Sequence, residues 1–361
     1  MTETIPNHSL ALVLPQFGYT LADCKVSSLG NGLINKTYLV KADDKTFVLQ
    51  CLNQQVFRVP EHVTNNIDLI SAHLSNKHAK HDYVLTPIWQ LRSLDDKNHV
   101  EVAGQYWRSL HYIEHCFTLE AINIDQANDV ASAFAQFSLA LSDFDSKKLA
   151  EIIPNFHNLS SRVEQLSLAI ENSSSDLIRQ AKNSIDFIQF HQDFIDDIAK
   201  ITKELPLRVT HNDTKINNLL FSKKTNKPIA VIDLDTCMAG YLMHDFGDMV
   251  RSCCASVAED SAELNDMVIN FDLVTALSRG YIAGFNGSLT KAEQKSLFLG
   301  VKLMPFMLAI RFLTDFLNGN QYFKIDYATH NLVRAENQLH LYKLFCQQDS
   351  LLAEIVLYQN T

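Results

Sequence analysis

The chain has 361 residues, of which 47% are hydrophobic and 20% are charged, and its formal net charge at pH 7 is −10. This composition is typical of a globular protein, and the length favours two domains or lobes over a single core. The acidic balance, which no basic stripe offsets, argues against a nucleic-acid partner.

The cysteines and the apolar runs bear on the cellular compartment. Seven cysteines are scattered along the chain, and no Cys-x-x-Cys pair occurs. This usage is typical of a reduced, cytoplasmic protein that employs cysteine as a small core residue. The N-terminal stretch lacks the pattern of a signal peptide, and no apolar run approaches about 18 residues, so we expect no membrane partner.

The first third of the chain is predicted to be rich in strands. Two extended runs flank a Gly-Asn-Gly turn at 30–32, and a further strand lies in "DDKTFVLQCLN". A helix is predicted to begin at Pro60, because apolar residues recur at helical spacing after it. Two more strands are expected in "YVLTPIWQL" and "QYWRSLHYIEH".

The rest of the chain is predicted to be mainly helical, and only residues 207–235 interrupt it with strands. The change in pattern near 112–118 divides the chain into a small sheet-plus-helix lobe, 1–114, and a larger helical lobe, 115–361. Apolar periodicity predicts helices near 125–145 and 175–205, then at roughly 262–284, 291–318 with a kink at Pro305, and 329–347.

A dense polar cluster, "HNDTKINN", lies between two of these strands and leads into "LLF", a turn and "PIAVIDLDT". Such a hairpin would fold back and place Asp233 beside Asn218, with Asp213 a few residues earlier on the same loop. Carboxylate and amide oxygens suit Mg²⁺, and Lys215 adds a positive charge. Together these groups are what phosphoryl transfer needs. Taken alone, "HND" would instead be interpreted as a polar turn that caps the backbone.

The motif His211-x-Asp213-x-Lys215-x-x-Asn218, followed by "VIDLD", resembles the catalytic loop of the protein-kinase-like superfamily, and most closely the aminoglycoside phosphotransferase and choline kinase family. The resemblance implies an α+β, two-lobed fold with ATP and Mg²⁺ as cofactors. It implies that Asp213 is the catalytic base and that Lys215 steadies the γ-phosphoryl group. Asn218 and Asp233 would hold the metal, with Asp235 as a more distant or second-metal ligand, and His211 would support the loop.

A literal Asp-Phe-Gly triplet at 245–247 is a competing metal motif. It lies beyond the hairpin, where a helix begins, so we interpret Asp245 and Asp248 as a structural cluster that pins the catalytic loop. Arg251 is expected to pair with one of these two carboxylates.

The nucleotide is expected to meet the small lobe at a glycine-rich turn formed by Gly30, Asn31 and Gly32, although a plain hairpin turn explains the same residues. Asn35 is nearby and tolerates left-handed geometry. The strand lysine of kinases is replaced by Gln50, which brings no charge. Either Lys36, Lys45 or Arg58 supplies that charge, or the enzyme manages with Mg²⁺ and Lys215. Backbone groups around Glu114 and Cys116 are expected to bind adenine.

The acceptor is expected to bind the larger lobe. Stretches such as "GNGLINKTYLV", "RFLTDFLNGNQYFK" and "HNLVRAENQL" resemble bacterial N-acetylhexosamine 1-kinases, which implies a small-molecule amino sugar as acceptor. Arg311 and Tyr322 are the candidate sugar contacts, while pairing of Arg311 with Asp315 and core packing of Tyr322 are the alternatives.

Other functions stay open at the level of the sequence. His157 and Arg162 could also contact the acceptor, although helix capping and surface pairing explain them equally well. An aminoglycoside site would need acidic groups, and the run at 259–267 is better interpreted as a solvated helix face. Because Gln50 replaces the lysine, a non-catalytic pseudokinase is a further alternative, which the intact Asp213, Asn218 and Asp233 oppose.

Overall fold

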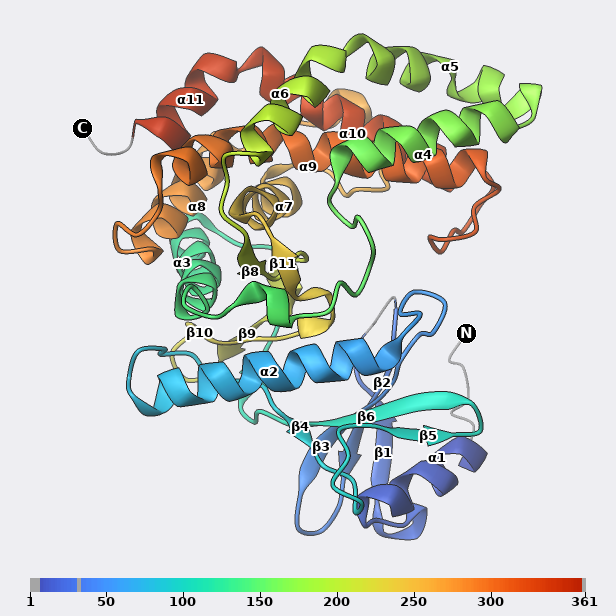
Figure 1. Ribbon diagram of the computed structural model, residues 1–361, viewed down its shortest axis with the longest axis vertical. Helices are drawn as coiled ribbons and strands as arrows, with labels where there is room; N and C mark the ends of the chain where they lie inside the picture. The colour runs from blue at the N-terminus through green and yellow to red at the C-terminus, as the bar shows by residue number, and fades with distance from the viewer. Residues whose placement is uncertain (1–6, 31–33, 359–361) are drawn as a thin grey trace.

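The computed structural model describes residues 7–30 and 34–358. A β-sheet with two helices forms the N-terminal part, and a larger assembly built mainly of helices forms the C-terminal part (Figure 1). This mixed architecture confirms the predicted α+β fold.

The N-terminal sheet has six strands, and each pairs with its neighbours in antiparallel fashion. The strand order is β1-β2-β3-β6-β4, and β5 pairs with β6. The strands are β1 Lys25–Ser28, β2 Lys36–Lys41, β3 Thr46–Cys51, β4 Gln90–Leu91, β5 Val100–Val102 and β6 Gln105–His111.

One predicted strand is largely wrong. Of "YVLTPIWQL" only β4, Gln90–Leu91, pairs in the sheet. Pro87 carries no N–H for a ladder, and the amide of Thr86 instead donates to the carbonyl of Ile229 in the C-terminal part, over 2.7 Å. This segment therefore connects the two parts rather than extending the sheet.

Two helices accompany the sheet. Helix α1, Asn7–Val13, contributes Leu10 and Val13 to a core under the strands. Helix α2, Pro60–Ala79, begins at Pro60 as predicted and buries its apolar face. Asn66 of α2 donates to the carbonyls of Ala150 and Cys237, at 2.9 and 3.1 Å. The helix therefore lies between the sheet and the C-terminal part (Figure 1).

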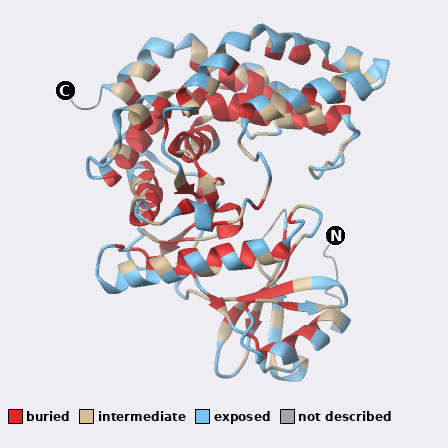
Figure 2. Ribbon diagram, in the orientation of Figure 1, coloured by how far each residue is buried: buried red, intermediate tan, exposed pale blue. Residues whose placement is uncertain are grey.

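The C-terminal part is organised around two largely buried helices, α7 and α9 (Figure 2). Glycines allow them to approach closely, since a Cβ on Gly247 would lie 2.1 Å from the carbonyl oxygen of Gly300. The helices are α3 Ile124–Ala140, α4 Leu159–Asn172, α5 Ser175–Phe190, α6 Gln192–Thr202, α7 Leu242–Cys254, α8 Phe271–Gly284, α9 Lys291–Leu317, α10 His330–Gln347 and α11 Asp349–Leu357.

Helix α9 is long and apolar enough to cross a membrane by length and composition alone. However, 78% of its most apolar window is buried in the fold, and it packs against α7 and α10. That burial is the pattern of a core helix. The helix continues through Pro305.

Two predicted helices differ from the structure. The predicted 175–205 helix is divided at His191 into α5 and α6, and the predicted 262–284 helix begins only at α8, with Asn270 as its N-cap. Residues 259–267 are therefore not a solvated helix face. Glu259 instead pairs with Arg251 and Arg334, each at 2.6 Å, which explains why this segment folds back onto the core.

Two small sheets carry the polar cluster. The hairpin of β9, Leu219–Ser222, and β10, Pro228–Val231, pairs with β7, Cys116–Phe117. Strand β8, Arg208–Thr210, pairs with β11, Met238–Gly240. The polar residues 211–218 thus connect β8 to β9 above the N-terminal sheet.

Candidate active site

Asp213 and Asn218 face each other across the loop between β8 and β9. A short 3-10 helix, Ile216–Asn218, turns the chain so that the Asn218 amide reaches back. Its Nδ2 donates to the backbone carbonyl of Asp213 at 2.8 Å and to the carboxylate at 3.0 Å. The amide therefore orients the predicted catalytic base and is itself fixed in place.

Lys215 lies beside the same carboxylate, with 3.5 Å between its Nζ and Asp213 Oδ1. Burial by itself would raise the pKa of Asp213, but Lys215, His211 and the Asn218 hydrogen bond hold that pKa below its usual value. The carboxylate is consequently ionised at neutral pH and can accept a proton.

Asp233 follows the hairpin and lies next to Asn218, as the pairing argument predicts. Leu219 pairs with Val231, and the amide of Ile232 donates to the Asn218 carbonyl at 2.9 Å. The backbone of Asp233 is left-handed, with φ 59°, a geometry that Asp tolerates better than most residues. The Asp233 carboxylate interacts electrostatically with Asp213 and Lys215, so it lies near the loop that carries them.

Crowded carboxylates surround Asp233. Asp233 is exposed to solvent by its surface area, yet the surrounding protein atoms, followed by the charges of Asp235 and Asp213, raise its pKa to about 7. A divalent cation would relieve this repulsion. The described residues contain no cluster of three histidine, cysteine or acidic ligands, so a metal here would rely on Asp233, the Asn218 amide oxygen and non-protein oxygens, which is the usual manner of Mg²⁺.

Asp245 anchors the loop that carries Asp213. Its carboxylate accepts hydrogen bonds from the backbone amides of His211, at 2.9 Å, and Asn212, at 2.7 Å. The loop needs this support because Asn212 has a left-handed backbone, with φ 64°. The predicted structural role of Asp245 is thus in accord with the geometry, and Arg251 pairs with Asp248 at 2.8 Å as predicted.

His211 supports the loop from inside the core. Its ring is fully buried against the edges of Phe134 and Phe137, and burial lowers its pKa. Its Nε2 lies 2.9 Å from the carbonyl oxygen of Ile232. A neutral imidazole thus joins the catalytic loop to the segment that carries Asp233.

Asp235 connects the two parts of the molecule. One oxygen of its carboxylate accepts from Asn35 at 2.6 Å, and the other pairs with Arg108 of β6 at 2.5 Å. Asn35 does not adopt the left-handed geometry that it would tolerate, because its φ is not among the positive values. Its side chain is instead held between Asp235 and the amide of Asn53.

Arg108 is the functional candidate that the sequence analysis missed. It lies directly opposite Gln50 in the β3–β6 ladder, and the two side chains are hydrogen-bonded. A charged residue in the middle of the short strand "QYWRSLH" was the available signal. Its significance depends on a partner 58 residues earlier, which the sequence did not identify.

The remaining predicted nucleotide residues are only partly described. Gly30 has φ +70°, in the left-handed region that suits glycine, while Asn31 and Gly32 lie outside the described residues. Glu114 is exposed between β6 and β7, and Cys116 begins β7 opposite Ser222. The segment proposed to face adenine is thus the crossing between the two parts.

Arg311 and Tyr322 lie near each other. Among the described residues, neither side chain is hydrogen-bonded or ion-paired to Asp213. The Arg311 guanidinium lies 4.7 Å from the ring centre of Phe156 and 5.9 Å from that of Tyr322. Arg311 forms no ion pair with Asp315 among the described residues; Asp315 instead accepts from the backbone amides of 321–323 and from Asn331.

A second arginine, Arg162, belongs to the same region. Burial and then the nearby charge of Arg311 lower its pKa to about 10. Burial, His244 and Arg311 also hold the pKa of His157 well below its usual value, and the rings of His157 and His244 lie 4.9 Å apart. Since His244 precedes the loop anchor Asp245, this cationic region adjoins the catalytic loop.

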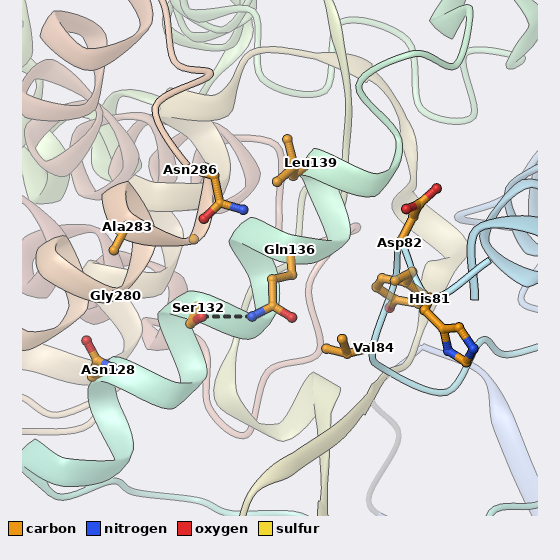
Figure 3. A pocket seen from close by; sticks show the side chains of 12 residues that line it. His81, Asp82, Val84, Asn128, Ser132, Gln136, Leu139, Gly280, Ala283 and Asn286 are labelled. Atoms are coloured by element: carbon orange, nitrogen blue, oxygen red, sulfur yellow. Dashed lines mark hydrogen bonds between the residues drawn. The ribbon is translucent and has the colours of Figure 1, made fainter. Parts of the chain in front are cut away.

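Two pockets differ in their relation to this site. A cavity of about 260 Å³ is lined by Lys215, Arg251, Glu259, Asn337 and Gln338 among others, and so opens beside the catalytic loop. Another, of about 420 Å³, lies between α3 and α8 (Figure 3).

The cavity between α3 and α8 is polar but contains none of the residues described above. Ser132 and Gln136 are hydrogen-bonded to each other within it at 3.0 Å. Although it is the larger of the two cavities, we therefore assign it no role in the site.

Comparisons with known proteins agree with this geometry. Residues 25–279 match the family model described as "Phosphotransferase enzyme family". Similar solved structures include an aminoglycoside phosphotransferase from Alicyclobacillus acidocaldarius, with a TM-score of 0.61, 12% identity and coverage of 97% of this chain and 98% of that one. A choline kinase from Cryptosporidium parvum has a TM-score of 0.54 and 13% identity, with coverage of 92% of this chain and 94% of that one. A spectinomycin phosphotransferase in complex with ADP and spectinomycin has a TM-score of 0.53 and 12% identity, with coverage of 95% of each chain.

Proposed function

Because the chain belongs to the phosphotransferase enzyme family, we propose that it transfers the γ-phosphoryl group of ATP to the anomeric hydroxyl of an N-acetylhexosamine, with Mg²⁺ as cofactor. The observation that carries the proposal is the grouping of Asp213, Asn218 and Asp233 at the end of one hairpin. The ADP bound to the similar spectinomycin phosphotransferase supports ATP as the donor.

Asp213 is the proposed base. Its carboxylate is ionised at neutral pH and is held by Asn218, so it can orient the acceptor hydroxyl and accept its proton. Lys215 lies beside it, where its ammonium can steady the phosphoryl group in transfer.

Asn218 and Asp233 are the proposed metal ligands. Bound Mg²⁺ would neutralise the charge on the phosphates. The role of the protein is to present two oxygen donors from neighbouring chain segments, which the hydrogen bond between Ile232 and Asn218 holds together. The raised pKa of Asp233 supports this assignment, since a cation would compensate the carboxylates around it.

The charge of the acceptor region favours a neutral or anionic acceptor. Arg311 and Arg162 form no ion pair with any carboxylate in the described part of the chain, and they lie close enough for one to lower the pKa of the other. A quaternary ammonium or a polycationic aminoglycoside would be repelled there. An N-acetylhexosamine carries no charge, and its hydroxyls can accept hydrogen bonds from the guanidinium groups.

The pocket beside Lys215 offers further contacts for a polar acceptor. Its lining includes the amides of Asn337 and Gln338, and the buried Oε1 of Gln338 has no hydrogen-bond partner among the described residues. The ring centre of Phe323 lies 5.4 Å from the guanidinium of Arg311 and 5.5 Å from that of Arg334, which pairs with Glu259 of the pocket lining. We therefore place the sugar along this surface.

The decisive experiment is an acceptor panel. ADP release is measured with N-acetylhexosamines, other sugars, choline, ethanolamine and aminoglycosides, and the product is identified by ³¹P NMR. We expect release with an N-acetylhexosamine and a product signal coupled to the anomeric proton. ADP release with a different acceptor would contradict the proposed sugar substrate but support the proposed kinase activity. Absence of release with every acceptor would favour the non-catalytic, nucleotide-binding alternative.

We also propose the division at 114/115 and a cytoplasmic location. The first is supported by β6, which ends in the N-terminal sheet at His111, and by β7, which pairs with the C-terminal strand β9. The second is supported by the seven cysteines, all of which are unpaired.

A further inference from the structure

The position that carries the phosphate-binding lysine in kinases holds the neutral Gln50, and a buried arginine lies beside it. Arg108 of β6 is the cross-strand partner of Gln50 and is only 1% exposed. Its Nε and Nη2 donate to Gln50 Oε1 at 2.9 and 2.7 Å. The two strands therefore place a positive charge where the side chain of β3 provides none.

The hydrogen bonds of Arg108 leave part of the guanidinium unused. Nε and Nη2 are occupied by Gln50 and Asp235, whereas Nη1 has no partner among the described residues. A guanidinium carries five N–H donors, of which Nη1 has two. Buried donors without acceptors are costly, and arginine binds phosphate oxygens through such paired donors.

The surroundings point toward the proposed phosphate site. Asp235, which pairs with Arg108, lies two residues after the proposed metal ligand Asp233. The guanidinium of Arg108 is thereby held against the segment that follows the metal-binding position. Gln50 is itself fixed, because its Nε2 donates to Thr37 at 3.0 Å.

We propose that Arg108 is the cation of the N-terminal sheet that binds the phosphate chain of ATP, through Nη1, and that Gln50 is the positioning residue that aims it. The inference rests on the proposed function, since it takes ATP as the donor. Compared with the strand lysine of kinases, the positive charge would lie on the neighbouring strand β6, still between the sheet and the metal-binding segment.

The first test is the variant R108Q, whose amide can still donate to Asp235. Binding of a non-hydrolysable ATP analogue with Mg²⁺, and of adenosine, is measured by calorimetry. We expect the Kd of the ATP analogue to rise about tenfold to a hundredfold, and the Kd of adenosine to stay within about twofold. Thermal unfolding verifies that the variant is folded.

Two further variants separate phosphate binding from a structural ion pair. Q50K/R108Q returns the cation to β3 and is expected to regain most of the lost affinity for the ATP analogue. R108K keeps the charge but not the forked guanidinium, and it replaces R108Q if that variant does not fold. We expect its affinity for the ATP analogue to fall several-fold and its affinity for adenosine to stay the same. R92Q is the matched control, because it removes the exposed arginine that pairs with Asp68, and it should leave both affinities unchanged.

The outcomes are distinct. An unchanged affinity of R108Q or R108K for the ATP analogue, or an equal loss for adenosine, would overturn the inference and reduce Arg108 to a structural partner of Asp235. Failure of the proposed function differs from this, because the unaltered protein would then bind no ATP analogue or transfer phosphate to no acceptor.

Discussion

The amide of Asn218 donates to the carboxylate of Asp213 over 3.0 Å, and this bond joins the proposed base to the proposed metal ligand. Because Nδ2 donates to Asp213, the amide oxygen of Asn218 is left as the atom that would bind a hard cation. In the proposed mechanism, the loop would therefore set the position of the acceptor hydroxyl relative to the metal.

The first prediction concerns Asp213. In D213N the acceptor for the hydroxyl proton is lost, while the backbone and the hydrogen-bonded turn remain. We expect kcat to fall by about 10²- to 10⁴-fold and the Kd for ATP to change by no more than about threefold. ADP release and calorimetry measure the two. D186N, which removes an exposed carboxylate of α5, is the matched control; turnover of D213N near the level of this control contradicts the assignment.

The second prediction concerns the metal. D233N removes the charge that would hold Mg²⁺, so we expect kcat to fall by at least about 100-fold and the Mg²⁺ concentration for half-maximal rate to rise. Binding of metal-free ATP should be equal or tighter, because one repelling carboxylate is gone. A Mg²⁺ titration of activity, together with calorimetry in the presence of a chelator, tests both effects. An unaltered Mg²⁺ dependence would exclude Asp233 as a ligand.

The hairpin was predictable because its signals are local. A turn between two apolar runs fixes the pairing of Leu219 with Val231, and this pairing alone brings Asp233 to Asn218. The supporting role of Asp245 was predictable for a similar reason. The metal ligand is expected at the end of a strand, whereas Asp245 lies where a helix begins. The chemistry of the loop is thus encoded within about 30 residues.

The roles of Arg108 and Glu259 were not predictable because they depend on tertiary partners that no local pattern reveals. Arg108 gains its role from Gln50 and Asp235, which lie on another strand and in the other part of the molecule. Glu259 belongs to an acidic run whose composition suggested a solvated helix, yet Arg251 and Arg334 hold it against the core. Tertiary ion pairs of this kind override local pattern.

The third prediction concerns the acceptor. Arg311 contacts three aromatic rings and has no carboxylate partner in the described chain, so its hydrogen-bond donors remain for the acceptor. In R311A we expect the KM for the sugar to rise about tenfold or more, with the KM for ATP nearly constant. R279A, which removes an arginine on the exposed face of α8, is the control. Equal changes in both KM values would indicate a structural role.

The fourth prediction concerns pH and stability. Burial alone would raise the pKa of Glu259, but Arg251, Lys215 and Arg334 lower it from its usual 4.5 to about 2. Because the folded pKa lies below the unfolded value, the ionised carboxylate stabilises the fold fully above pH 4.5. This stabilisation disappears as the pH falls from about 4.5 to 2. It is on the order of 3 kcal/mol at neutral pH.

In E259Q we therefore expect the free energy of unfolding to fall by about 2–3 kcal/mol at pH 7, and the deficit to shrink as the pH is lowered from 4.5 toward 2. Denaturant unfolding at a series of pH values measures it. E263Q changes an exposed glutamate of the same segment and should match the unaltered protein. A deficit of equal size at pH 7 and pH 3 would mean that the loss comes from packing, because only the ionised carboxylate can make the contribution depend on pH.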